Sequence, residues 1–222
     1  MVKAVIFDMD GILINSEPLW RVAMQKSFGK VGLTIEKDTF KETQGLRIDE
    51  VVKYWFRKKP WAGMTCEELT EDILDELTVL LLERGQALEG VYDVIALLKA
   101  KQVPIAVASS SPHRILDACL TAMKLKDAFP IVCSAEDVAK GKPDPAVFNN
   151  AAEALGLPGD ECLVFEDSFN GMVSALAAGM KVVAVPETHV YRPERFAAAD
   201  LVLESLAQFG EEELASFMGA SA

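Results

Sequence analysis

Two aspartates separated by one residue, Asp8 and Asp10, end an apolar run near the start of the chain, in the stretch VIFDMDG. Side chains two residues apart on a strand point to the same side, so the two carboxylates would lie close together. Neighbouring carboxylates repel each other unless a cation joins them. Gly11, which follows, allows a tight turn and offers an unobstructed backbone N–H. The stretch therefore suggests a cation site, although acidic residues that merely end a strand at the surface would give the same pattern.

Two further stretches carry groups that bind anions. Three serines at 109–111, including Ser109 and Ser110, precede Pro112 and a predicted helix. Hydroxyls and free N–H groups at a helix N-terminus favour an anion, and Ser111 also fits the position of a simple N-cap. Lys142, in KGKPDP, stands just before another predicted helix start. Its ammonium could reach the strand ends from there, or it could be an ordinary surface lysine.

A second acidic pair, Glu166 and Asp167, follows an apolar run in LVFEDSFNG. Carboxylate oxygens are hard ligands that suit Mg²⁺, which commonly keeps several waters and takes only one or two carboxylates. Each of the four stretches is a weak signal alone. Their placement at the predicted ends of strands or starts of helices is what makes them indicate one shared site.

The elements that must position these residues follow from hydrophobic patterning. Short, continuously apolar runs alternate with helical patterns, which is typical of a parallel sheet covered on both faces. We therefore predict a Rossmann-like α/β fold whose ligands bind beyond the carboxyl ends of the strands. The predicted strands are 3–8, 104–109, 130–134, 162–166, 181–185 and 200–204.

A long interval after the first predicted strand breaks this alternation, because it holds helical patterns and no strand-like run. It is too long to be a loop. We expect a small helical domain at 15–85, inserted into an α/β core domain made of 1–14 and 86–222. All three tryptophans of the chain lie in the insertion, where they either form its core or face a substrate.

Composition excludes several classes of function. The chain has 222 residues and a formal net charge of −12, which argues against nucleic acid as a partner because phosphate backbones need a basic surface. No apolar run approaches the roughly 18 residues of a membrane span. The four cysteines show no CxxC spacing, and the start lacks a signal-peptide cleavage site. We therefore expect a cytoplasmic protein with free thiols.

The motifs DMDG, ASSS, KGKPDP and FEDSFNG, in this order, resemble those of the haloacid dehalogenase superfamily of phosphotransferases. The resemblance covers the whole chain, including the helical insertion, which is similar to that family's small cap. GILINSEPLW and QGLRIDEVVKYW are similar to the branch of beta-phosphoglucomutases and small sugar-phosphate phosphatases, and most of all to 2-deoxyglucose-6-phosphate and hexitol phosphatases. The resemblance implies a monomeric, Mg²⁺-dependent phosphatase that acts on a small phosphorylated metabolite.

The resemblance also implies roles for individual residues. Asp8 would be the nucleophile that forms an aspartyl-phosphate, and Asp10 the general acid and base. Asp8, the backbone carbonyl of Asp10 and Asp167 would bind Mg²⁺, with Glu166 in or just outside this set. The remaining residues would bind the phosphoryl group or the substrate: Gly11, Ser109, Ser110 and Lys142 from the core, and Glu17, Trp20 and Arg47 from the cap.

Trp20 favours hydrolysis over phosphosugar mutase activity. Beta-phosphoglucomutases carry a cap histidine ten residues after the acid/base aspartate, and Trp20 holds that position here. The two histidines, His113 and His189, both lie outside the insertion. A hexose, deoxyhexose or hexitol phosphate fits the branch, and a nucleoside 5′-monophosphate such as pseudouridine phosphate is the alternative. A receiver signalling domain fits poorly, because it has the opposite order of acidic residues and no helical insertion.

Overall fold

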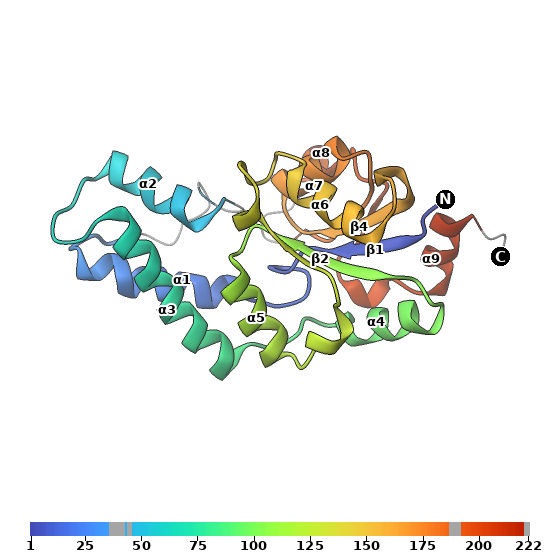
Figure 1. Ribbon diagram of the computed structural model, residues 1–222, viewed down its shortest axis with the longest axis horizontal. Coiled ribbons are helices and arrows are strands. Elements are labelled where there is room, and N and C mark those ends of the chain that lie inside the picture. The colour runs from blue at the N-terminus through green and yellow to red at the C-terminus, as the bar shows by residue number, and fades with distance from the viewer. Residues whose placement is uncertain (36–42, 44–45, 187–191, 220–222) are drawn as a thin grey trace.

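The computed structural model describes residues 1–35, 43, 46–186 and 192–219. Six parallel strands form one sheet in the order β3-β2-β1-β4-β5-β6 (Figure 1). Each predicted run contains one of them, so the predicted parallel sheet is confirmed. The strands are β1 (Ala4–Phe7), β2 (Ile105–Ser109), β3 (Val132–Ser134), β4 (Cys162–Glu166), β5 (Lys181–Ala184) and β6 (Leu201–Val202). The edge strands β3 and β6 are shorter than predicted, and so is the central strand β1.

Both faces of the sheet are buried, as continuous apolar strands require. Val5 and Phe7 of β1 belong to one buried cluster, and Ile6 between them belongs to a second cluster on the opposite face. The first cluster includes apolar residues of the flanking helices α4 and α5, and the second includes those of α6 and α7. The helices of this part are α4 (Val91–Ala100), α5 (His113–Ala122), α6 (Ala146–Leu155), α7 (Phe169–Ala177), α8 (Pro193–Phe196) and α9 (Glu211–Met218).

Three helices, α1 (Glu17–Lys30), α2 (Ile48–Lys58) and α3 (Cys66–Arg84), lie together at one end of the molecule, beside the sheet (Figure 1). We call them the cap helices. Leu69, Ile73 and Leu77, spaced by one helical turn, are fully buried along α3. The inserted helical part of the predicted fold is thereby confirmed. The domain boundaries after residues 14 and 85 stay a prediction.

The two connections between the sheet and the cap helices run side by side. Ile14 forms an isolated antiparallel bridge with Ala87, and the Leu88 N–H donates to the Leu13 carbonyl at 3.0 Å. The cap helices are therefore joined to the sheet through one paired neck, which Leu13–Ile14 and Ala87–Leu88 form between β1 and α1 and between α3 and α4.

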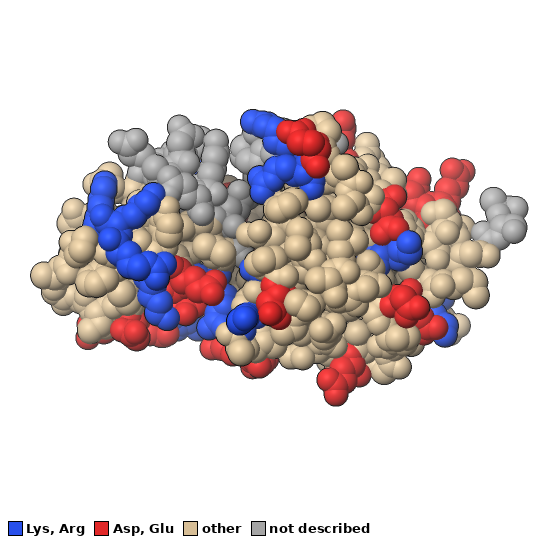
Figure 2. Space-filling view, turned by 90° about the horizontal axis from the view of Figure 1, so that it is seen from above, with Lys and Arg blue, Asp and Glu red and all other residues tan. Residues whose placement is uncertain are grey.

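On the face seen in Figure 2, Lys and Arg side chains gather at the end formed by the cap helices and in a second group at the upper centre. Asp and Glu side chains lie beside both groups and over the rest of this face. All four cysteines are free thiols, as predicted. Among the described residues, the helices include none that is long and apolar enough to cross a bilayer.

Candidate active site

The predicted polar stretches meet at the carboxyl ends of the three central strands. Asp8 follows β1, Ser109 ends β2, and Glu166 ends β4 with Asp167 directly after it. Parallel register aligns these strand ends, since Phe7 of β1 pairs with Val107 and with Phe165. The side chains line one cavity between the sheet and the cap helices α1 and α2. The predicted site residues that line it are Asp8, Asp10, Gly11, Glu17, Trp20, Ser109, Ser110, Lys142, Glu166 and Asp167.

Lys142 is the centre of the charge network. It is only 4 % exposed, so the surface-lysine alternative is wrong. Its Nζ donates to Asp8 Oδ1 at 2.7 Å, to Glu166 Oε1 at 2.7 Å and to the Ala108 carbonyl at 3.2 Å. Burial by itself would lower the pKa of Lys142, but the carboxylates of Asp8 and Glu166 raise it above its ordinary value. The ammonium is therefore charged and held against the predicted nucleophile.

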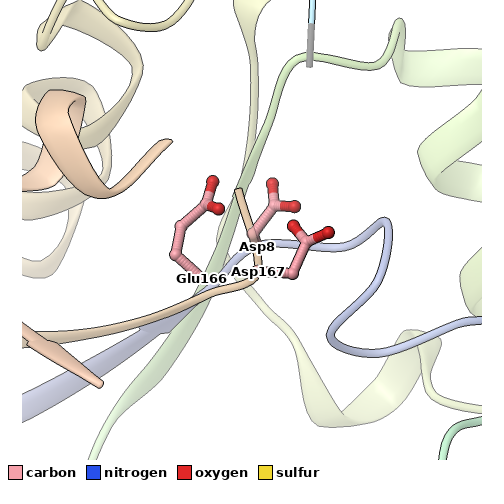
Figure 3. Close-up of side chains that lie close together, drawn as sticks. All are labelled: Asp8, Glu166 and Asp167. Carbon is pink, nitrogen blue, oxygen red and sulfur yellow. The ribbon is translucent and has the colours of Figure 1, made fainter. Parts of the chain in front are cut away.

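Three carboxylates point toward the same space at the strand ends (Figure 3). Asp8, Glu166 and Asp167 each offer one oxygen, and these oxygens lie within 4.8 Å of one another. Burial, only partly offset by Lys142, raises the pKa of Asp8 to about 7, and the nearby Glu166 and Asp10 add to the shift. Burial followed by repulsion from Glu166 and Asp8 raises the pKa of Asp167 well above its usual range. Three acids against one lysine leave an excess of negative charge that a divalent cation would balance, and carboxylate oxygens are hard donors, so the residues fit Mg²⁺.

Glu166 has partners for both carboxylate oxygens. Oε1 accepts from Lys142, and Oε2 accepts from the Ser168 backbone N–H at 2.7 Å and from its hydroxyl at 3.0 Å. A Cβ on Gly171 would lie 1.6 Å from Oε1, so glycine at this position makes room for the carboxylate. These contacts favour a place for Glu166 behind the metal ligands rather than among them.

Gly11 is required by backbone geometry as well as by space. Its φ is +78°, in the left-handed region that side chains disfavour. A Cβ at Gly11 would also lie 2.4 Å from Asp167 Oδ2. The glycine after the aspartate pair therefore lets the chain turn tightly against the acidic cluster.

Asp10 is held by three donors that its sequence context did not reveal. Oδ1 accepts hydrogen bonds from the Ser16 hydroxyl and from Trp20 Nε1, the latter at 3.2 Å, and Oδ2 accepts from the Ser111 hydroxyl at 2.8 Å. Ser111 is thus not the predicted N-cap of the following helix. Pro112 takes that position, and the serine hydroxyl turns to the aspartate instead. Ser16 and Ser111 both line the cavity.

Arg47 lies beside this cavity rather than among its lining residues. Its Nε donates to Asp49 Oδ1 at 3.1 Å, and its Nη1 donates to the Val138 carbonyl at 3.3 Å. A Cβ on Gly141 would meet the Arg47 side chain at 3.1 Å, so the arginine packs on the loop that carries Lys142. A contact between Arg47 and the substrate stays a prediction. Neither histidine is placed in the cavity: His113 Nε2 lies 2.6 Å from Asp137 Oδ2 on the surface of the α/β part of the protein, and His189 lies outside the described residues.

The pKa of Asp8 predicts how the stability of the metal-free protein depends on pH. The unfolded chain releases this proton near pH 4, whereas the folded protein holds it until about pH 7. The free energy of unfolding should therefore fall as the pH rises from about 4 to about 7, by up to about 4 kcal/mol from this group. Urea unfolding at pH 5 and pH 8 in EDTA measures the effect.

Two comparisons isolate the contribution of Asp8 to this pH dependence. The Asp8→Asn variant should show a smaller loss between pH 5 and pH 8, because its amide does not titrate. Added Mg²⁺ should also reduce the loss, because a cation favours the ionised carboxylates. Identical pH dependence in the wild type and in Asp8→Asn would contradict the assignment.

Comparison with known proteins places this geometry in a family. Residues 5–185 match the haloacid dehalogenase-like hydrolase family. Hexitol phosphatase B of Escherichia coli (strain K12) is 37% identical over 214 residues, which cover 96% of each chain. A probable pseudouridine-5′-phosphatase of Drosophila melanogaster is 32% identical over 220 residues, 96% of this chain and 93% of that protein.

Solved structures agree with this placement. The crystal structure of CbbY from Rhodobacter sphaeroides in complex with phosphate has a TM-score of 0.88, 26% sequence identity, and coverage of 95% of this chain and 97% of that one. A second structure of CbbY is a complex with xylulose-1,5-bisphosphate. The resemblance inferred from the four motifs is confirmed, as is the expectation of an enzyme. The chain belongs to the haloacid dehalogenase-like hydrolase family.

Proposed function

We propose that the protein is a Mg²⁺-dependent phosphatase that hydrolyses sugar or sugar-alcohol monophosphates through an aspartyl-phosphate on Asp8. One observation carries the proposal: the Lys142 ammonium lies 2.7 Å from the Asp8 carboxylate, beside Asp167, in a cavity that the cap helices α1 and α2 also line. A carboxylate that approaches a phosphate dianion is repelled, and a fixed ammonium offsets that repulsion. A cytoplasmic location and a monomeric state are parts of the proposal that stand on the sequence alone.

The reaction has two steps at phosphorus. In the first, a bond forms between an Asp8 oxygen and phosphorus while the bond to the alcohol oxygen breaks, and Asp10 gives that oxygen a proton. In the second, water attacks phosphorus, Asp10 takes a proton from the water, and the aspartyl-phosphate bond breaks to release phosphate. Mg²⁺, when bound by Asp8, Asp167 and the Asp10 carbonyl, would supply positive charge to the phosphoryl oxygens.

The phosphoryl group itself would be bound by the core. Ser109 and Ser110 line the cavity where β2 ends, next to the turn at Gly11. Hydroxyl and backbone N–H donors at such a strand end suit the equatorial oxygens of the transferring group, on which negative charge spreads in the transition state. The core residues therefore carry out the same reaction on every substrate, and the cap helices determine substrate specificity.

The cap side of the cavity supports a small polyol substrate. It presents apolar side chains together with a few polar ones, among them Glu17 and Thr43, whose oxygens can bond to hydroxyl groups. The similarity to hexitol phosphatase B supports a hexitol or hexose phosphate. Hydrolysis is favoured over mutase activity because the described residues that line the cavity include no histidine. The similarity to a probable pseudouridine-5′-phosphatase makes a nucleoside 5′-monophosphate the second candidate.

Phosphate release with and without Mg²⁺, across a panel of monophosphates, tests the proposal. The panel contains sorbitol 6-phosphate, 2-deoxyglucose 6-phosphate, glucose 6-phosphate and pseudouridine 5′-phosphate, and beta-glucose 1-phosphate with a coupled assay for glucose 6-phosphate. We expect Mg²⁺-dependent release, highest with the hexitol and deoxyhexose phosphates. Preference for pseudouridine 5′-phosphate would replace the sugar assignment, and isomerisation of beta-glucose 1-phosphate without net release would make the protein a mutase.

A further inference from the structure

The indole of Trp20 contacts the acid/base carboxyl, a contact that the proposed reaction does not use. Trp20 Nε1 donates to Asp10 Oδ1 at 3.2 Å. The same oxygen accepts from the hydroxyl of Ser16, which lies one helical turn before Trp20. The other oxygen, Oδ2, accepts from the hydroxyl of Ser111 at 2.8 Å. Both carboxylate oxygens of Asp10 thus accept hydrogen bonds from side chains.

The three donors differ in what they can do when a proton moves. A serine hydroxyl can donate or accept, so Ser111 does not require that Oδ2 stay a hydrogen-bond acceptor. An indole N–H can only donate, so Trp20 requires that Oδ1 stay a hydrogen-bond acceptor. The arrangement therefore leaves Oδ2 as the oxygen that exchanges a proton with the leaving group or with water.

The donors also come from different parts of the molecule. Ser16 is the residue at the N-cap of α1, and Trp20 lies in the first turns of that cap helix. Ser111 lies in the core, between β2 and α5. Two of the three donors to the Asp10 carboxyl therefore come from the start of cap helix α1, and the third comes from the core.

We propose that Trp20 is a positioning residue for Asp10: its indole N–H holds Oδ1 and so orients the carboxyl for proton transfer. This inference rests on the proposed function, because it takes Asp10 to be the general acid and base. It assigns Trp20 a role in the chemical step, beyond that of a side chain that lines the cavity.

The dependence on the leaving group tests this assignment. Trp20→Phe keeps an aromatic ring and removes the N–H. For sorbitol 6-phosphate, whose alcohol leaves poorly without a proton, kcat/KM should fall about 10- to 100-fold, mainly through kcat. For p-nitrophenyl phosphate, whose phenolate leaves without a proton, kcat/KM should fall less than about threefold.

Two further variants separate the N–H from the bulk of the ring. Trp20→His restores a ring N–H, since its Nε2 can take the place of the indole Nε1, and should recover part of the loss with sorbitol 6-phosphate. Trp55→Phe is the matched control: Trp55 is a buried cap tryptophan, 4 % exposed, whose indole nitrogen has no hydrogen-bond partner within the described part of the chain. It should leave kcat/KM for both substrates within about twofold.

The outcomes separate this inference from the proposed function. If the wild type releases no phosphate from either substrate, the proposed function fails and this inference fails with it. If the wild type is active but Trp20→Phe slows both substrates equally, or changes only KM, Trp20 shapes the pocket and does not orient Asp10. A Trp20→His variant without recovery would mean that ring size is what matters, and would also overturn the assignment.

Discussion

Replacing Asp8 by asparagine should lower phosphate release from any monophosphate by about 10⁴-fold or more, while the protein stays folded. The amide is a poor nucleophile and cannot form the aspartyl-phosphate. Its Oδ1 can still accept the 2.7 Å hydrogen bond from Lys142, so the packing around position 8 has no reason to change. Initial rates with saturating Mg²⁺ and far-UV circular dichroism measure the two halves of the prediction.

Stability should not fall with activity in this variant. Asp8 is only 6 % exposed, and its pKa is raised to about 7 mainly by burial, so the ionised carboxylate is costly to bury at pH 8 in the absence of a metal. A neutral amide avoids that cost. The free energy of unfolding of Asp8→Asn in EDTA at pH 8 should therefore equal or exceed that of the wild type.

An exposed aspartate provides the control. Asp127 lies on the surface, and Asp127→Asn should keep wild-type rates and stability. Mass spectrometry of the wild type quenched in acid during turnover should detect one added phosphoryl group, which the Asp8→Asn variant should lack. Residual turnover within tenfold of the wild type, or a phosphoryl group found on another residue, would rule out Asp8 as the nucleophile.

The sheet and most of the site could be predicted from the sequence for one physical reason. Parallel strands buried on both faces must be continuously apolar, so each run and the polar residue that ends it are visible in the chain. Asp8, Ser109 and Glu166 stand at three such ends, and the carboxyl ends of strands in a parallel sheet share an edge. That their strands β1, β2 and β4 are neighbours in the sheet is a result of the structure and was not predicted.

Contacts across the fold could not be predicted in the same way. Ser111 and Trp20 both donate hydrogen bonds to Asp10. These bonds depend on how the neck and α1 pack against the loop after β2, and no local sequence pattern predicts that packing. The serine has a satisfactory local explanation as a helix cap, and that explanation is wrong here. Gly171 is the glycine of the FEDSFNG motif, and the sequence alone does not explain why glycine stands there. The structure does, because a side chain at this position would clash with the Glu166 carboxylate.

Replacing Lys142 by methionine should remove activity and much of the stability together. Methionine keeps most of the side-chain volume but removes the charge that Asp8 and Glu166 share. Breaking a buried ion pair from one side costs about 3–5 kcal/mol, because the remaining charges lack compensation. Phosphate release should fall about 10³-fold or more, because an ammonium that stabilises the transferring phosphoryl group is gone. Urea unfolding in EDTA and rates in Mg²⁺ measure the two losses.

A second substitution separates the two roles of this lysine. In Lys142→Met with Glu166→Gln, one uncompensated carboxylate is neutralised, so about half of the lost stability should return while activity stays lost. Lys140→Met, at an exposed lysine two residues earlier, is the matched control and should change neither quantity. Recovery of activity in the double variant would mean that Lys142 serves only to balance Glu166. Unchanged stability in Lys142→Met would mean that the buried carboxylates are neutral in the folded protein, and the charge network described here would then be wrong.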